Sequence, residues 1–256
     1  MEQILYSALE SKRFNANIYR CNTDSFDYTI LNDHIINHKV DVLILRLPTS
    51  TKSTHYNLLK LPYPVLHADT LVYYKCDLSK ISEFPLRDNL LLVQLTPDDK
   101  KIIKGLIPTI FEGYQNHYFS NPLFDRTKIT EGYIEWASSF WEDTEKVCWG
   151  ILNAEKQIVA FVCGTISPSK KNCELILAGV VPEFSNQGLY TYLIQQVQSF
   201  LKDNDYKEVS LSTQIQNIAV QRAWIKSGFN LAYSLDTYHI NSRLGNWHLE
   251  NEFKKF

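Results

Sequence analysis

Short apolar runs, each followed by a polar segment rich in turn-forming residues, divide this chain into alternating strands and helices. The apolar run in residues 174–181 predicts a buried strand, which ends at Pro182. Apolar residues spaced three and four apart then predict a helix over 188–202. A second strand over 207–213 and a second helix over 217–227 follow. This order of elements is the strongest signal in the sequence.

The loop between the first of these strands and its helix has the physical properties of a phosphate site. It covers residues 183–190 and contains one glycine, Gly188. A helix N-terminus presents N–H groups that have no partner inside the helix, at the positive end of the helix dipole. Phosphate groups bind at such N-termini, and a glycine allows the backbone to approach them closely.

The remaining segments predict an α/β fold, with a mixed sheet wrapped by helices. Thr96 and Pro97 mark a helix start, because threonine caps helices and proline suits their first turn. A boundary is therefore predicted there, between an N-terminal α/β lobe (1–96) and a second domain (97–256). The further predicted strands cover 40–47, 63–74, 90–95, 147–153, 157–167 and 232–240, and the further predicted helices cover 57–61, 97–114 and 130–139.

Composition and charge agree with a soluble enzyme. The formal net charge is −2, so no surface-wide field attracts nucleic acid. No apolar run is long enough to span a bilayer, and the first residues lack the pattern of a secretory signal. Five cysteines, an odd number without metal-ligand spacing, predict reduced structural thiols in the cytoplasm and no metal site.

Three short motifs occur in a fixed order around the loop. A V-x-P element ends at Pro182, and residues 185–190 follow at the strand–helix junction, with Gly188 as their fourth residue. An N-x(10)-G-F element begins at Asn217 and ends at Phe229. This order resembles the GNAT superfamily of acyl-CoA N-acyltransferases, although the junction keeps only the central glycine of the signature (Q/R)-x-x-G-x-(G/A). The resemblance implies the GNAT fold and transfer of an acyl group to an amine.

For the donor, the resemblance implies acyl-CoA as a co-substrate and no permanently bound cofactor. The main chain at Val180 and Val181 is expected to pair with the pantetheine arm, with one of its N–H groups facing the thioester oxygen. Asn217 is expected to hydrogen-bond the pantetheine region, to cap the following helix, or both. The pyrophosphate is expected on the backbone N–H groups around Gln187, Gly188, Leu189 and Tyr190.

The general acid stays open. Related enzymes commonly carry a tyrosine where this chain has Trp224, whose indole donates a hydrogen bond but is no practical acid. Tyr238 or Tyr233 could protonate the departing thiolate instead. The thiolate could also leave unprotonated, because a thiol with a pKa of about 8.5 is a tolerable leaving group. A packing role is expected for Trp224.

The general base is equally open. Glu174 stands at the start of the strand before the loop, where some GNAT enzymes keep a catalytic glutamate, although a solvent-facing charge explains it as well. An amine on a sugar is less basic than lysine, so its deprotonation near neutral pH needs little help. Water, His117 or Asp69 could therefore suffice.

A looser resemblance covers most of the chain. Its motif segments lie at 22–26, 44–48, 68–74, 117–122 and 131–136. They look like the GNAT branch that acylates nucleotide-linked amino sugars, such as the dTDP-fucosamine acetyltransferases of bacterial surface-glycan (O-antigen, lipopolysaccharide) synthesis. In that branch the N-terminal lobe helps to build the sugar-nucleotide cleft, and the acyl group would be acetyl or a longer one such as 3-hydroxybutanoyl. The expected substrate contacts are Arg46, Asp69, His117 and Tyr118, and a homodimer stays open.

Two other functions fit the same motifs. A degenerate GNAT fold could bind acyl-CoA without turnover, which the altered junction and Trp224 would explain. Alternatively, a GNAT enzyme could act on the amine of a protein or a small metabolite. Release of free thiol in the presence of an amino-sugar nucleotide would separate these functions from the first.

Overall fold

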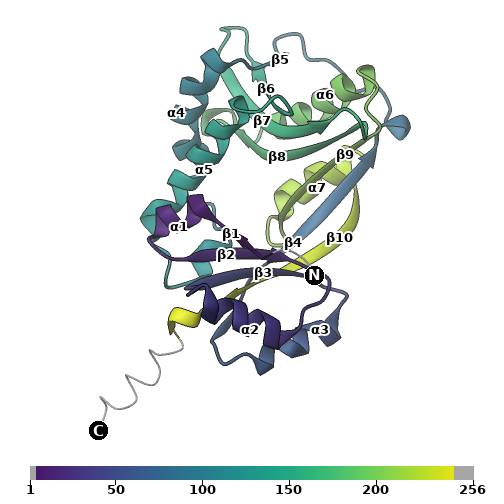
Figure 1. Ribbon diagram of the computed structural model, residues 1–256. Helices are drawn as coiled ribbons and strands as arrows, with labels where there is room; N and C mark the ends of the chain where they lie inside the picture. Colours follow the sequence, from purple (N-terminus) through teal and green to yellow (C-terminus); the bar gives the residue numbers. More distant parts are fainter. Residues whose placement is uncertain (1–3, 245–256) are drawn as a thin grey trace. The chain divides into compact units, whose positions relative to one another are not determined.

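The computed structural model describes residues 4–244 and groups them into two compact units, which are described separately here (Figure 1). Unit 1 contains residues 4–71, 115–129 and 233–244, and unit 2 contains 72–114 and 130–232. The division therefore does not follow the single boundary predicted near residue 97. The reason is that β4 (Val65–Asp77) and β10 (Asn230–Ile240) are long strands that each contribute residues to both units.

Unit 1 is built around a β-α-β element. β2 and β3 are parallel, with Cys21 opposite Leu45, and α2 provides the crossover that parallel strands need. β10 pairs antiparallel with the other edge of β3, with Tyr238 opposite Leu45. The first residues of unit 1 were not assigned to elements from the sequence. Its elements are β1 (Leu5–Tyr6), α1 (Ala8–Phe14), β2 (Ile18–Asn22), α2 (Tyr28–Asn37), β3 (Val42–Pro48) and α3 (Lys52–Tyr56).

Unit 2 is a mixed sheet with the strand order β4-β9-β8-β7-β6-β5. β8 and β9 run parallel, and the β5 to β8 strands are antiparallel neighbours. The elements are β5 (Leu91–Gln94), α4 (Lys100–Ile110), α5 (Ile129–Ser138), β6 (Lys146–Leu152), β7 (Ile158–Ser167), β8 (Asn172–Val180), α6 (Leu189–Asp203), β9 (Glu208–Gln214) and α7 (Ile218–Lys226).

The structure confirms the predicted α/β fold and, from residue 90 onward, each predicted element. Thr96 and Asp99 form a capping box, and a 3-10 turn at Pro97–Asp99 precedes α4. That helix ends at Ile110, four residues before the predicted end at 114. Pro108, in its last turn, has no N–H to continue the hydrogen bonding. The short helix predicted at 57–61 is a 3-10 turn that follows α3.

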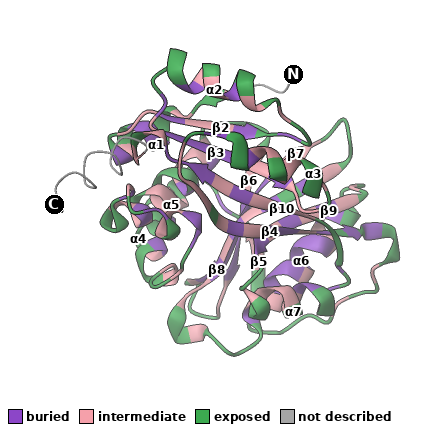
Figure 2. Ribbon diagram, turned by 90° about the horizontal axis from the view of Figure 1, so that it is seen from below, coloured by how far each residue is buried: buried purple, intermediate pink, exposed green. Residues whose placement is uncertain are grey.

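Unit 2 buries apolar side chains on both faces of its sheet, as the buried colouring in Figure 2 shows. α6 and α7 cover one face, where Leu193 and Trp224 are buried. α4 and α5 cover the other, where Ile103 and Ala137 are fully buried. This arrangement leaves the ends of the strands as the place where a ligand can reach the sheet. All five cysteines are free and buried, at positions 21, 76, 148, 163 and 173.

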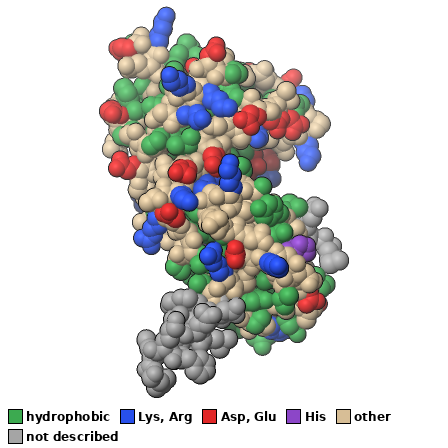
Figure 3. Space-filling model, turned by 60° about the vertical axis from the view of Figure 1, so that its left-hand side comes forward, with side chains coloured by type: hydrophobic (Ala, Val, Ile, Leu, Met, Phe, Trp, Pro, Cys, Tyr) green, Lys and Arg blue, Asp and Glu red, His purple; other side chains and the backbone are tan. Residues whose placement is uncertain are grey.

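The helices and ionisable side chains of residues 4–244 differ from what a membrane span and a metal site require. No helix in that range is long and apolar enough to cross a membrane, and no cluster of His, Cys, Asp or Glu there could hold a metal ion. On the face drawn in Figure 3, basic and acidic side chains are interspersed. That mixture agrees with the formal net charge of −2.

Unit 1 contains a buried charged network that centres on Glu10. Arg20 donates from its Nε to Glu10 Oε2 at 2.5 Å, and the Tyr118 hydroxyl also donates to this carboxylate. Burial alone would raise the pKa of Glu10, but the hydrogen bonds and charge of Arg20, with those of Ser7 and Tyr118, lower it to about 2. An isolated carboxyl at this position would not stay ionised, so Arg20 is what makes the site tolerable.

We expect Glu10→Gln to destabilise the protein in a pH-dependent way. Because the folded-state pKa lies below the unfolded value of 4.5, the stabilisation is present above pH 4.5 and is lost as the pH falls toward 2. A shift from 4.5 to about 2 corresponds to at most about 3 kcal/mol. Urea unfolding of wild type and variant from pH 7 to pH 3 measures the difference, with the exposed Glu155→Gln as control. A difference independent of pH would contradict this account.

Candidate functional site

The central feature of unit 2 is that β8 and β9 separate along their length. Their parallel pairing runs only from Asn172 opposite Glu208 to Leu175 opposite Leu211. β8 nevertheless continues to Val180 and β9 to Gln214, without further pairing between them. The strands therefore diverge toward their carboxyl ends, which can be followed in Figure 1. The main chain of β8 is left with an edge that an extended ligand can pair with.

A β-bulge marks the position where the separation begins. Leu175 lies opposite Gly164 and Leu177 opposite Cys163, so Ile176 is an extra residue in β8. A bulge bends its strand and increases the local twist, which turns the end of β8 away from the direction of β9. No sequence pattern predicts this bulge, because the apolar run of β8 is continuous.

The N–H groups of β8 alternate between its two edges. Val181 donates its N–H to the carbonyl oxygen of Val159 at 2.9 Å, on the β7 side. Because successive N–H groups of a strand point to opposite edges, those of Ala178 and Val180 point to the β9 side. Of the two valines predicted to contact the pantetheine arm, only Val180 therefore directs its N–H into the opening, and Ala178 joins it.

The loop after β8 leads into α6 through two residues in the left-handed region. Asn186 has a φ of 61° and Gly188 a φ of 72°. Gly188 is the N-cap of α6, and no side chain caps this helix start. The N–H groups of the first turn, from Leu189 onward, therefore have no intrahelical acceptor, and residues 185–188 are exposed. The loop fits the predicted anion site in both backbone conformation and exposure.

Arg87 lies directly at this loop, which the sequence did not indicate. Its Nη1 donates to the Gln187 carbonyl oxygen at 3.0 Å, and its guanidinium lies 5.1 Å from the centre of the Tyr192 ring. A Cβ added at Gly188 would come within 3.2 Å of Arg87 Nη2. The segment before β5 thus brings a fixed cation to the start of α6. No local pattern could have revealed a contact across 100 residues of sequence.

A polar cluster closes the carboxyl end of β9. The Tyr114 hydroxyl donates to Gln214 Oε1 and lies 3.4 Å from Thr213 Oγ1. Asn217 donates from its Nδ2 to Thr213 Oγ1 at 3.1 Å. Asn217 occupies the N-cap position of α7, but its side chain makes no capping hydrogen bond. Its amide is thus directed toward the end of β9, and its predicted contact with pantetheine stays a prediction.

Trp224 is buried, and its indole contacts a second tyrosine near the diverging strands. Its Nε1 donates to the Tyr190 hydroxyl at 3.1 Å, and its ring packs edge-on against Tyr74. Burial raises the pKa of Tyr190 well above its usual value, and nearby Tyr114 contributes in the same direction. The Tyr190 side chain is therefore a neutral hydroxyl held by the indole, in addition to the predicted role of its backbone N–H.

Glu174 lies in the paired part of β8, between Thr165 of β7 and Ser210 of β9. Its side chain is on the opposite face from Cys173 and Leu175, and it reaches solvent. Partial burial raises the pKa of its carboxyl. A raised pKa makes the carboxylate a stronger base, so the position is compatible with the predicted base role.

In unit 1, His117 belongs to a buried chain of hydrogen bonds. Asn121 donates from its Nδ2 to His239 Nδ1 at 3.1 Å, so His239 carries its proton on Nε2. That nitrogen lies 2.9 Å from His117 Nδ1, which accepts, and the remaining proton of His117 is on its Nε2. Burial lowers the pKa of both histidines, to about 3 for His239. His117 is a neutral group of the interior rather than an exposed contact.

The other predicted substrate contacts in unit 1 differ in their exposure. Tyr118 is engaged by Glu10 and Arg20, and Asp69 is buried. Arg46 is half-buried, opposite Thr237 in the sheet. As sites of substrate contact, all of these positions stay predictions.

Tyr238, predicted as an acid, lies in a separate polar cluster of unit 1. Its hydroxyl is 3.0 Å from His55 Nδ1, whose other nitrogen is 3.1 Å from the Pro48 carbonyl oxygen. His67 Nε2 lies 3.1 Å from Asp236 Oδ1, and the half-exposed His67 ring is beside Tyr238. The Tyr238 hydroxyl is thus already paired with an imidazole of the same unit.

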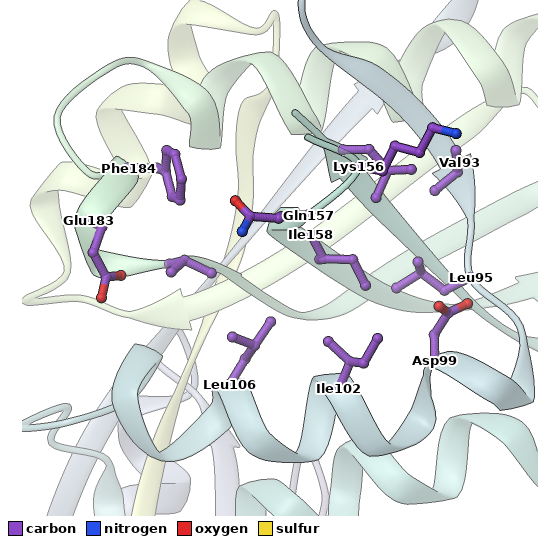
Figure 4. Close-up of a pocket in the computed structure, with 12 residues that line it drawn as sticks. Val93, Leu95, Asp99, Ile102, Leu106, Lys156, Gln157, Ile158, Glu183 and Phe184 are labelled. Atoms are coloured by element: carbon purple, nitrogen blue, oxygen red, sulfur yellow. The ribbon is translucent and has the colours of Figure 1, made fainter. Parts of the chain in front are cut away.

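A cavity of about 660 Å³ lies next to the loop in unit 2 (Figure 4). Ile102 and Leu106 of α4 form one wall, and Ile158 forms part of the sheet side. Glu183 and Phe184 of the loop line its other end. The lining is mainly aliphatic, with charged groups among it, so the cavity suits an apolar group of a ligand that also contacts the loop.

Comparison with known proteins addresses the family. Residues 109–229 match the model of the acetyltransferase (GNAT) family. A GCN5-related N-acetyltransferase from Sphaerobacter thermophilus has a TM-score of 0.65 at 11% identity, over 93% of this chain and 75% of that one. One from Kribbella flavida has a TM-score of 0.55 at 10% identity, over 87% and 81%. No curated protein matches the chain.

A protein of unknown function from Staphylococcus epidermidis ATCC 12228 covers the chain similarly, with a TM-score of 0.58 at 14% identity over 93% of this chain and 90% of that one. At identities this low, these similarities indicate a shared fold and nothing further. The matched segment contains the diverging strands, the loop, α6 and α7. Residues 109–229 of this chain are therefore similar in sequence to the GNAT acetyltransferase family, and the solved structures share its fold.

Proposed function

We propose that this protein is an acyl-CoA-dependent N-acyltransferase that acylates the amine of a nucleotide-linked amino sugar. The main support for acyl-CoA as the donor is the separation of β8 from β9, which is followed by a helix start without a side-chain cap. An extended thiol arm pairs with a free strand edge, and a pyrophosphate binds at a helix N-terminus. Acyl-CoA joins these two chemical groups in one molecule.

The loop has lost most of its family signature, and Arg87 supports the proposal that it still binds phosphate. Ser185 and Tyr190 replace the Gln or Arg and the small residue of the signature. The guanidinium of Arg87 supplies a positive charge from another segment, and arginine pairs well with phosphate oxygens. The backbone N–H groups and this side chain together form a cation-assisted anion site.

The transfer itself requires few protein groups. The neutral amine nitrogen attacks the thioester carbonyl carbon, the C–S bond breaks, and CoA leaves as its thiolate. The N–H group of Ala178 or Val180 would hydrogen-bond the carbonyl oxygen as negative charge develops on it. The ammonium proton passes to a base, for which Glu174 has a raised pKa and access to solvent. Water remains the alternative base, because a sugar amine is already weakly basic.

The acceptor half of the proposal rests on unit 1 and on the sequence resemblance. Unit 1 has residues outside the matched GNAT segment and offers ionic and aromatic groups on a small sheet. Arg46 could pair with a nucleotide phosphate. Asp236, beside the half-exposed His67, could receive an ammonium group. An amino-sugar nucleotide carries both kinds of group, whereas a simple alkyl amine carries one.

The function is tested by release of free thiol from acetyl-CoA and 3-hydroxybutanoyl-CoA over a panel of amino-sugar nucleotides. We expect turnover with at least one dTDP-linked amino sugar and a strong loss in Arg46→Ala. Polyamines and peptide amines serve as the competing acceptors. Turnover with these amines and not with any nucleotide sugar would show that the acceptor is a polyamine or peptide amine instead of an amino-sugar nucleotide. Binding of acyl-CoA without turnover on any acceptor would favour the non-catalytic module.

Arg87→Ala should weaken acyl-CoA binding by about tenfold, because a charge-assisted contact to phosphate is lost. Isothermal titration of CoA, with and without 150 mM salt, measures the loss, and the salt dependence should fall in the variant. Arg87→Lys should recover only part of the affinity, since lysine cannot pair with two oxygens at once. Arg126→Ala, on the exposed surface of unit 1, is the charge-matched control. Unchanged affinity in Arg87→Ala would exclude Arg87 from the donor site.

Gly188→Val should abolish measurable CoA binding while the protein stays folded. A β-branched residue is strained at a φ of 72°, and its Cβ would press on Arg87. Gly113 has a φ of 71° with open space around the position of a Cβ, so Gly113→Val is matched for backbone strain. Equal loss of thermal stability in both variants, with loss of CoA binding only at 188, is the expected result. Retained CoA binding in Gly188→Val would show that the phosphates bind elsewhere.

A further inference from the structure

Among the described residues, the Tyr190 hydroxyl accepts a hydrogen bond but does not donate one. It accepts from Trp224 Nε1 at 3.1 Å, which fixes the position of its oxygen. Within residues 4–244, no group accepts the Tyr190 proton in return. The indole has a single N–H and cannot accept a hydrogen bond. This half-buried hydroxyl can therefore donate its proton to a ligand atom while Trp224 holds its oxygen.

Two interactions relate this hydroxyl to the elements around the opening between β8 and β9. Tyr190 itself lies in the first turn of α6, the helix that follows β8 and its loop. Trp224, which holds the hydroxyl, comes from α7, the helix that follows β9. Tyr114, which acts on the Tyr190 pKa through its charge, bonds to Gln214 at the end of β9. The hydroxyl therefore lies between α6 and α7, and Tyr114 connects it to the carboxyl end of β9.

We propose that Tyr190, positioned by Trp224, donates its hydroxyl proton to the sulfur of CoA as the thiolate leaves. The inference rests on the proposed function, because it requires acyl-CoA in the opening between β8 and β9. Trp224 is then a positioning residue, and Tyr190 is the residue that touches the reacting atoms. The hydroxyl is supplied by α6, although the sequence resemblance placed it on α7.

The step balances in protons and charge. As the C–S bond breaks, its electron pair goes to sulfur, and the proton of Tyr190 moves to sulfur to give the neutral CoA thiol. The phenolate that remains accepts the Trp224 N–H and is reprotonated from solvent before the next turnover. Burial raises the Tyr190 pKa, so the hydroxyl carries its proton throughout the neutral range. Tyr238 is less suited, because its hydroxyl already pairs with His55.

The first test uses binding alone and needs no acceptor. CoA and desulfo-CoA differ at the sulfur, so their affinity ratio reports a contact to that atom. We expect wild type to prefer CoA by about fivefold, the scale of one hydrogen bond, and Tyr190→Phe to remove the preference. Tyr206→Phe, a partly buried tyrosine elsewhere in the same core, should keep it. A preference for CoA that survives in Tyr190→Phe would overturn the proposal.

The second test is rescue in turnover. Tyr190→Phe should lower kcat for thiol release by about 10²-fold with little change in KM. Adding Trp224→Tyr to this variant supplies a hydroxyl from α7 in place of the one removed from α6. The double variant should have a kcat at least about tenfold higher than that of Tyr190→Phe. A merely structural role for Tyr190 would give no rescue, because Trp224→Tyr also removes a buried indole. Absence of rescue in a folded double variant would overturn the proposal.

The outcomes separate this inference from the proposed function. Failure of wild type to bind CoA or desulfo-CoA would remove the donor site itself. Binding of both ligands with equal affinity would keep the donor site and exclude the Tyr190 contact. Thermal unfolding of each variant checks the fold, since Tyr190→Phe leaves the Trp224 N–H without its partner and should lower the melting temperature.

Discussion

The separation of β8 from β9 after Leu175 and Leu211 is the constraint on which the rest of unit 2 depends. Unpaired strand edges inside a sheet are costly, because their N–H and C=O groups lose water without gaining partners. The bulge at Ile176 fixes where pairing stops, and the apolar helices on both faces hold the sheet together around the opening. The main-chain groups of Ala178 and Val180 are thereby available to a ligand rather than to a neighbouring strand.

Residues of the GNAT signature that are absent from the loop have counterparts that come from other elements of the structure. At Ser185 the loop lacks the polar or basic residue of the family signature, and Arg87 brings a guanidinium to the same loop. At Tyr190 a bulky residue stands where the signature has a small one, and its ring turns into the core against Trp224. The loop thus keeps its backbone geometry at Gly188 while its side-chain chemistry comes from other elements.

The sequence predicted the fold well where one short pattern decides an element. The periodicity of α6 and the apolar run of β8 are local signals, and Thr96 caps the 3-10 turn that leads into α4, where Thr96 and Pro97 predicted a helix start. The bulge at Ile176, the contact of Arg87 with Gln187 and the hydrogen bond from Trp224 to Tyr190 depend on long-range packing, so no window of sequence contains them. For the same reason, no window of sequence shows that β4 and β10 each contribute residues to both units.

In the proposed mechanism, the first turn of α6 links donor binding to the departure of the thiol. Its backbone N–H groups are available to the proposed phosphate, and the side chain of Tyr190 in the same turn contacts Trp224. A phosphate that settles on this turn lowers the freedom of the helix start and so fixes the hydroxyl as well. Trp224 strengthens this link, because the large buried indole leaves the hydroxyl one hydrogen-bonded position. A tyrosine on α7 would act independently of the loop, whereas a tyrosine on α6 is placed by the same turn that binds the donor.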